Sequence, residues 1–141
     1  MPRRVVVDSG PLVALFSRRD GDHRRALEFF EVWQDADHAT TLAVVTEVVY
    51  LLDFRRDAQL DFLQLIQAGA IEVISLEARD WDRIIELSKK YADLPIDFAD
   101  ATLVAICERL GTRQIATVDS DFQVYRYLNR HAFENVFLAG S

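Results

Sequence analysis

The segment RRVVVDSGPLVALF, residues 3–16, predicts a buried strand that leads directly into a helix. Its three consecutive valines form the short apolar run typical of a strand that is covered on both faces. Asp8 ends this run, and Pro11 suits the first turn of a helix because its backbone has no N–H to leave unpaired. Asp8 is therefore expected where a strand ends and a helix begins.

The rest of the chain repeats this alternation of strand and helix. Apolar and β-branched runs predict strands at residues 38–43, 71–76, 113–118 and 135–140. Helical periodicity predicts helices at residues 11–19, 22–34, 44–54, 57–69, 77–91, 97–111 and 121–128. Alternating strands and helices indicate an α/β fold with a mostly parallel central sheet.

Length and composition favour one compact domain over residues 1–141, since half of the residues are hydrophobic and 28% are charged. No apolar run approaches the roughly 20 residues that span a bilayer, and the apolar run at the N-terminus is too short for a signal peptide. The only cysteine, Cys107, lies in an apolar segment, so we expect a buried thiol and a reduced, cytoplasmic protein.

The net charge of −7 argues against non-specific binding to a polyanion. Basic charge is nevertheless concentrated in adjacent arginine pairs at residues 3–4, 18–19, 24–25 and 55–56. Two interpretations stay open for these pairs, namely solvated helix ends with salt bridges, or contacts with phosphate groups.

Acidic residues follow two of the predicted strands. Asp8 ends the first strand, and the segment TVDSDF places Asp119 and Asp121 after the strand at residues 113–118. Because ligand sites in open α/β sheets form outside the carboxyl ends of the strands, these acids are expected at one edge. Each also has a structural interpretation, since Asp8 and Asp121 could cap the helices that follow them.

Two further acids adjoin apolar segments. Asp100 lies in the first turn of the helix at residues 97–111, where Asp97 is the expected N-cap. Glu47 is the only charged residue between positions 39 and 52. It could belong to the same acidic site, or it could lie on a narrow polar stripe of its helix. Clustered carboxylates repel one another unless a cation neutralises them. Oxygen ligands alone favour Mg²⁺ or Mn²⁺, a type of site suited to phosphodiester hydrolysis. The three histidines have no metal-ligand spacing and are expected at the surface or at caps.

The chain resembles the PIN-domain ribonucleases, and within them the VapC-type toxins of toxin–antitoxin pairs. The resemblance spans the whole chain and rests on VVVDSGPLVALF, TEVVYLL, DFADATLVAICERLG and IATVDSDF, in this order. It implies a three-layer α/β/α fold with about five short strands. It also implies catalytic and metal-binding roles for Asp8, Glu47, Asp100 and Asp119, with Asp121 as an alternative ligand or auxiliary group and Ser9 and Thr117 as auxiliary hydroxyls.

The resemblance further implies an endoribonuclease that depends on Mg²⁺ or Mn²⁺. Its expected partners are the RNA substrate, a second copy of the chain in a homodimer, and an antitoxin protein on a separate chain; no membrane is implied. The main alternative is an inactive PIN-like binding or scaffolding module. A receiver domain is disfavoured because no lysine follows Lys90, and a DxD phosphatase because Gly10 occupies the second acid position.

Overall fold

A five-stranded sheet forms the centre of the molecule in the computed structural model, which describes residues 3–138. The strand order is β3-β2-β1-β4-β7, and every neighbouring pair in this sheet is parallel. The strands are β1 (Arg4–Val7), β2 (Asp37–Thr40), β3 (Glu72–Val73), β4 (Gln114–Ala116) and β7 (Glu134–Asn135). The predicted parallel sheet of about five short strands is therefore confirmed.

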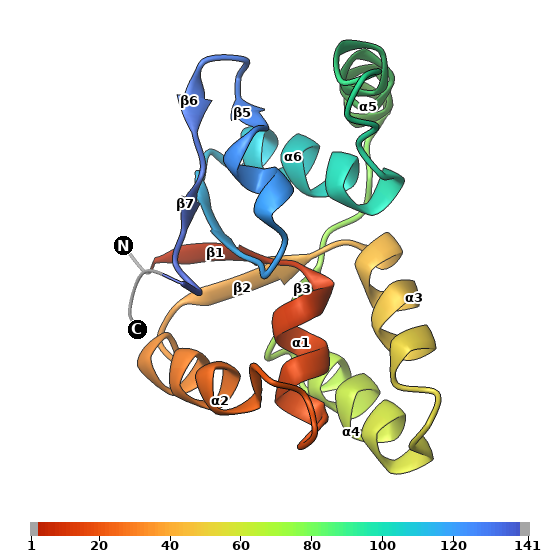
Figure 1. Ribbon diagram of the computed structural model, residues 1–141, viewed down its shortest axis with the longest axis vertical. Helices are drawn as coiled ribbons and strands as arrows, with labels where there is room; N and C mark the ends of the chain where they lie inside the picture. Colours follow the sequence, from red (N-terminus) through yellow and green to blue (C-terminus); the bar gives the residue numbers. More distant parts are fainter. Residues whose placement is uncertain (1–2, 139–141) are drawn as a thin grey trace.

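Helices cover both faces of this sheet, as Figure 1 shows. On one side lie α1 (Ser9–Phe16), α2 (His23–Val32) and α4 (Arg56–Gln67), and on the other lie α5 (Ala78–Lys90) and α6 (Phe98–Leu110). A further helix, α3 (Leu42–Leu51), contacts both α1 and α6. This arrangement confirms the three-layer fold. Among the helices that the structure describes, none is long and apolar enough to cross a membrane.

The core is built around β1 and α6. The three valines of β1 are completely buried, because the strand is central and covered on both faces. Every residue of α6 from position 99 to 107 is buried, including Cys107, as expected. The helix begins at its cap Asp97 and ends at Gly111, whose positive φ of 73° suits glycine. A helix buried this deeply also holds Asp100, in its first turn, away from solvent.

The predicted helix at residues 121–128 is mostly wrong. Only a 3₁₀ turn, η1 (Ser120–Gln123), forms there, and the chain then makes an antiparallel hairpin of β5 (Arg126–Tyr127) and β6 (His131–Ala132). The turn between these strands uses Leu128 and Asn129 with positive φ, and the Leu128 N–H donates to Glu108 Oε2 of α6 at 2.8 Å. Contacts with a distant helix thus override the local helical pattern.

Other elements are shorter than predicted. The helix predicted at residues 11–19 ends at Phe16, and the strand predicted at residues 71–76 keeps only two residues. The last predicted strand is reduced to β7, and its residues 139 and 140 lie outside the described part of the chain.

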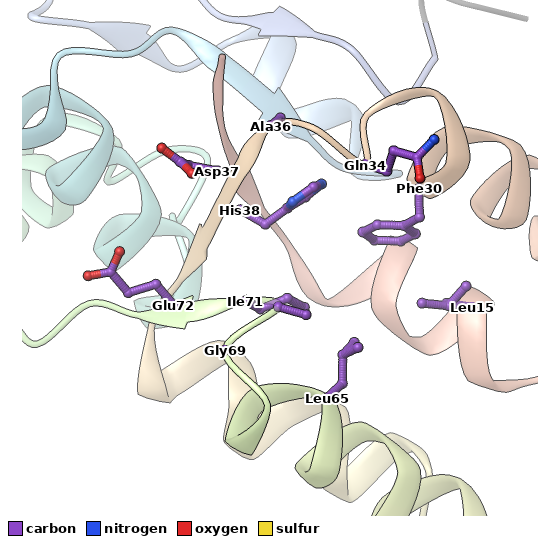
Figure 2. Close-up of a pocket in the computed structure, with 11 residues that line it drawn as sticks. Leu15, Phe30, Gln34, Ala36, Asp37, His38, Leu65, Gly69, Ile71 and Glu72 are labelled. Carbon is purple, nitrogen blue, oxygen red and sulfur yellow. The ribbon is translucent and has the colours of Figure 1, made fainter. Parts of the chain in front are cut away.

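The expectation of a surface or capping role is wrong for His38, which is buried in β2. Its ring packs against Phe29 and Phe30, and it lines a cavity of about 450 Å³ between β2, β3 and the helices α1, α2 and α4 (Figure 2). Burial lowers the pKa of His38, so its ring favours the neutral form. His23 bonds to the Ala14 carbonyl.

Candidate metal centre

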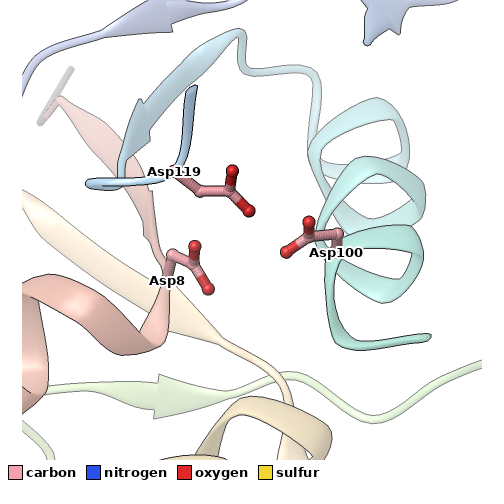
Figure 3. Close-up of side chains that lie close together, drawn as sticks. All are labelled: Asp8, Asp100 and Asp119. Atoms are coloured by element: carbon pink, nitrogen blue, oxygen red, sulfur yellow. The ribbon is translucent and has the colours of Figure 1, made fainter. Parts of the chain in front are cut away.

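Three aspartates from three different elements converge at one edge of the sheet. Asp8 follows β1, Asp119 follows β4, and Asp100 lies in the first turn of α6. Each offers a carboxylate oxygen, and these oxygens all lie within 4.8 Å of one another (Figure 3). The convergence follows from topology, since β1 and β4 pair in parallel and the Asp8 N–H donates to the Ala116 carbonyl at 2.9 Å.

Asp8 has both of the roles that the sequence left open. Its carboxylate accepts a bond from the Ser9 N–H at 2.7 Å and so caps α1. The Thr117 hydroxyl donates to the other oxygen, Asp8 Oδ2, at 2.7 Å. The same Thr117 oxygen accepts a bond from the Asp119 N–H at 2.9 Å. Thr117, fully buried, therefore fixes the positions of two members of the cluster relative to each other.

Asp97 and Asp100 have different roles at the start of α6. The Asp97 carboxylate accepts a bond from the Asp100 N–H at 2.8 Å, as the expected N-cap does. The Asp100 side chain is left to face the cluster, where the Tyr125 hydroxyl approaches its Oδ2 at 3.4 Å. Sequence reasoning missed Tyr125, because residues 121–128 were expected to form a helix.

The two acids of TVDSDF are not equivalent. Asp119 belongs to the cluster, and its Oδ1 also accepts a bond from the Asp121 N–H at 2.9 Å, which caps η1. Asp121 lies outside the group of three aspartates. The negative charge of Asp119 raises the pKa of Asp121. One residue thus both caps the turn and contributes to the cluster, whereas the sequence suggested two residues sharing these roles.

Glu47 lies beside the three aspartates but outside their tight group. The Ser9 hydroxyl donates a hydrogen bond to Glu47 Oε1, which joins the start of α1 to the middle of α3. The position of α3 is further fixed by the bond between the hydroxyls of Thr41 and Thr102 at 2.8 Å. Burial is the main cause of the raised pKa of Asp8, and the charge of Glu47 adds to it, so the two carboxylates interact electrostatically.

The cluster carries negative charge without a cationic partner. Among residues 3–138, no arginine, lysine or histidine forms an ion pair with Asp8, Glu47, Asp100 or Asp119.

Burial raises the pKa of Asp8 to about 6, opposed by the bonds from Thr117 and Ser9. Burial and then the charge of Asp8 raise the pKa of Asp100 to about 9. Ionisation of all the carboxyl groups in the cluster therefore needs a counter-charge. A site made of oxygen donors alone fits a hard divalent cation such as Mg²⁺ or Mn²⁺.

Gly10 allows the first turn of α1 to lie against the loop that carries Asp119. A Cβ atom at position 10 would lie 2.3 Å from Val118 Cγ2 and 3.3 Å from Val118 Cβ. We expect Gly10→Ala to displace this loop and to weaken Mn²⁺ binding at least several-fold by calorimetry. Gly21→Ala is the matched control, because a Cβ there meets nothing within 4 Å. Equal Mn²⁺ affinity in both variants would show that the close approach is unimportant.

The sequence matches a known protein family. The family model described as PIN domain matches residues 5–127. Among curated proteins, Ribonuclease VapC26 of Mycobacterium tuberculosis is 32% identical over 117 residues, which cover 82% of this chain and 86% of that protein.

Two solved structures have the same fold. VapC20 of Mycobacterium tuberculosis, described as a sarcin-ricin loop cleaving toxin, superposes with a TM-score of 0.76 at 20% identity, covering 85% of this chain and 93% of that chain. A chain of VapBC2 from Rickettsia felis, solved bound to a DNA fragment from its promoter, superposes with a TM-score of 0.66 at 15% identity. That match covers 94% of this chain and 98% of the other.

Proposed function

The chain belongs to the PIN-domain family, and from this premise we propose that it is a metal-dependent endoribonuclease of the VapC type that hydrolyses RNA phosphodiester bonds. The observation that carries the proposal is the convergence of Asp8, Asp100 and Asp119 without a cationic partner. The relative that is 32% identical bears the name of a ribonuclease, which agrees with this chemistry.

Asp8, Asp100 and Asp119 would hold the cation, which we propose is Mg²⁺ or Mn²⁺. Such an ion supplies a Lewis acid that neutralises charge on the phosphate and makes a water more acidic. Glu47, outside the tight group but beside Asp8, would orient the attacking water or accept its proton. Ser9 holds the Glu47 carboxylate by a hydrogen bond, and Thr117 holds that of Asp8. Asp121 is left with an auxiliary role.

The binding partners are also inferred from membership of the PIN-domain family. We propose that RNA is the substrate, that a cognate antitoxin on a separate chain inhibits the enzyme, and that the chain forms a homodimer. The fold that this chain shares with a chain of VapBC2 from Rickettsia felis agrees with an antitoxin as partner. We also propose that residues 1–141 act as one domain.

The test is cleavage of a mixed pool of cellular RNA by purified protein. With Mn²⁺ or Mg²⁺ we expect discrete fragments, and with EDTA we expect none. Asp8→Asn removes one charge from the cluster at nearly constant volume and is expected to abolish cleavage while circular dichroism stays unchanged. Cleavage that survives both EDTA and this substitution would refute the proposal. A folded protein that cuts no RNA under any condition would favour the binding-module alternative.

A further inference from the structure

A second cavity adjoins the carboxylate cluster. It has a volume of about 260 Å³ and is lined by Asp119, Phe122, Gln123, Phe133, Asn135 and Leu138. About nine water molecules, at the volume that each occupies in the liquid, would fill this cavity. That is the scale of one nucleobase. Asp119 belongs to both the cavity and the cluster, so a ligand in this cavity lies next to the proposed site of cleavage.

We propose that this cavity binds the base of a nucleotide next to the scissile phosphate, an inference that rests on the proposed ribonuclease function. The cavity offers the two kinds of contact that unpaired bases use, namely aromatic surface and an amide. Because a base must be unstacked to enter, the substrate needs an unpaired nucleotide at the cut.

Phe122 and Phe133 are the aromatic residues of the lining, and the accessible aromatic surface comes mainly from Phe133. The ring of Phe122 is buried, and that of Phe133 meets it edge to face, with centroids 5.7 Å apart and planes at 84°. Phe133 also contacts the ring of Tyr127, in the hairpin. Phe133 is only partly buried, so part of its side chain remains for a ligand to contact.

The amide that can recognise a base is that of Gln123. Its side chain is exposed and, within residues 3–138, forms none of the side-chain hydrogen bonds that hold the fold. The Asn135 amide, by contrast, is already engaged. Its Nδ2 donates to the Thr117 carbonyl at 2.9 Å, and its Oδ1 accepts bonds from the N–H groups of Thr117 and Phe137.

These bonds of Asn135 make the cavity and the cluster one rigid unit. Asn135 holds the backbone of Thr117, and the Thr117 hydroxyl bonds to both Asp8 and Asp119. A base in the cavity would therefore be positioned relative to the carboxylates by the fold itself. This fixed spacing is what a subsite for a neighbouring nucleotide requires.

The chemistry of Gln123 favours adenine over guanine. A glutamine amide pairs with the donor and acceptor on the N6–N7 edge of adenine, whereas the O6–N7 edge of guanine offers two acceptors and pairs with arginine. Wild-type protein should therefore cut next to adenine, and Gln123→Arg should shift the preference to guanine.

The experiment uses single-stranded RNA oligonucleotides with randomised sequence, cut in the presence of Mn²⁺, followed by sequencing of the product ends. We expect about a tenfold enrichment of adenine over guanine at one position flanking the cut. Gln123→Ala should bring the ratio close to one, and Gln123→Arg should invert it. Phe133→Leu, which removes the ring while keeping an apolar side chain, should raise KM.

Gln34→Ala is the matched control, since Gln34 is an exposed glutamine that lines the cavity beside His38. Its base preference should equal that of the wild type. Cleavage by the wild type without any base preference, or a preference that Gln123→Ala and Gln123→Arg leave unchanged, would overturn the subsite and leave the ribonuclease function standing. No cleavage of these oligonucleotides or of cellular RNA, with Mn²⁺ or with Mg²⁺, would overturn both.

Discussion

Replacing Asp100 with asparagine is expected to reduce metal-dependent RNA cleavage on the order of 10³-fold. Asp100 is 4% exposed and faces Asp8 and Asp119, so its charge is directed at the proposed cation rather than at solvent. Asparagine keeps the size of the side chain but offers a neutral amide in place of a carboxylate. Mn²⁺ binding, measured by calorimetry on metal-free protein, should be lost together with cleavage.

Asp97→Asn is the control for this substitution. Asp97 lies three residues away on the same helix end and caps α6 through the Asp100 N–H. Asparagine is as good an N-cap as aspartate, so this variant should keep its fold and nearly all of its activity. Equal losses in the two variants would mean that charge near the end of α6, and not a ligand at Asp100, supports cleavage.

The second large effect concerns the stability of the metal-free protein at neutral pH. The pKa of Asp100 is raised from 3.8 to about 9 by burial and by neighbouring acids, and that of Asp8 is raised to about 6. A carboxyl group whose pKa is higher in the folded state stabilises the fold below its unfolded pKa. That contribution disappears as pH rises through the folded pKa. Metal-free protein should therefore lose stability from about pH 4 up to about pH 9.

The contribution of Asp100 to stability is measured most clearly between pH 6.5 and 8. This range lies above the unfolded pKa of His38, and Asp100 is still titrating within it. Urea unfolding in EDTA should show the free energy of unfolding falling by about 1.4 kcal/mol per pH unit. In Asp100→Asn this slope should be nearly absent. At pH 7 the variant should be more stable than the metal-free wild type by about 4 kcal/mol, because the wild type has lost about 1.4 kcal/mol for each pH unit above the unfolded pKa.

Added Mn²⁺ should remove this difference. A ligand at about 1,000 times its Kd stabilises the folded state by about 4.1 kcal/mol, and only the wild type has all the proposed ligands. A variant that is no more stable than the wild type in EDTA would contradict the view that the cluster lacks a counter-charge. The expected pattern is that the carboxylate cluster lowers the stability of the metal-free protein and that a bound cation restores it.

The sequence by itself predicted the elements whose signals are local. The valines of β1 and the end of α6 at Gly111 were indicated by neighbouring residues, and the structure confirms them. A helix directly after Asp8 was also expected, although α1 begins at Ser9, two residues before Pro11. The meeting of Asp8 and Asp119 could also be expected. In a parallel sheet the carboxyl ends of strands share one edge, so their position in the sequence predicts their position in space.

Other features depend on contacts between residues far apart in the chain. The hairpin of β5 and β6 forms where local periodicity favoured a helix, because the Glu108 carboxylate, 20 positions away, binds the Leu128 N–H. His38 is buried, although histidine alone predicts nothing about depth, because Phe29 and Phe30 of α2 pack over β2.

The candidate site also combines features that the sequence indicated with features that only the tertiary structure shows. Sequence patterns indicated which acids stand at element ends, but they could not show that Asp119 caps η1 and joins the cluster at once. Nor could they place Tyr125 against Asp100, or Gln123 in a cavity beside Asp119. Local propensity depends on neighbours in the chain and so selects helices and strands. Burial, charge coupling and cavity shape depend on neighbours in space, which only the packed tertiary structure defines.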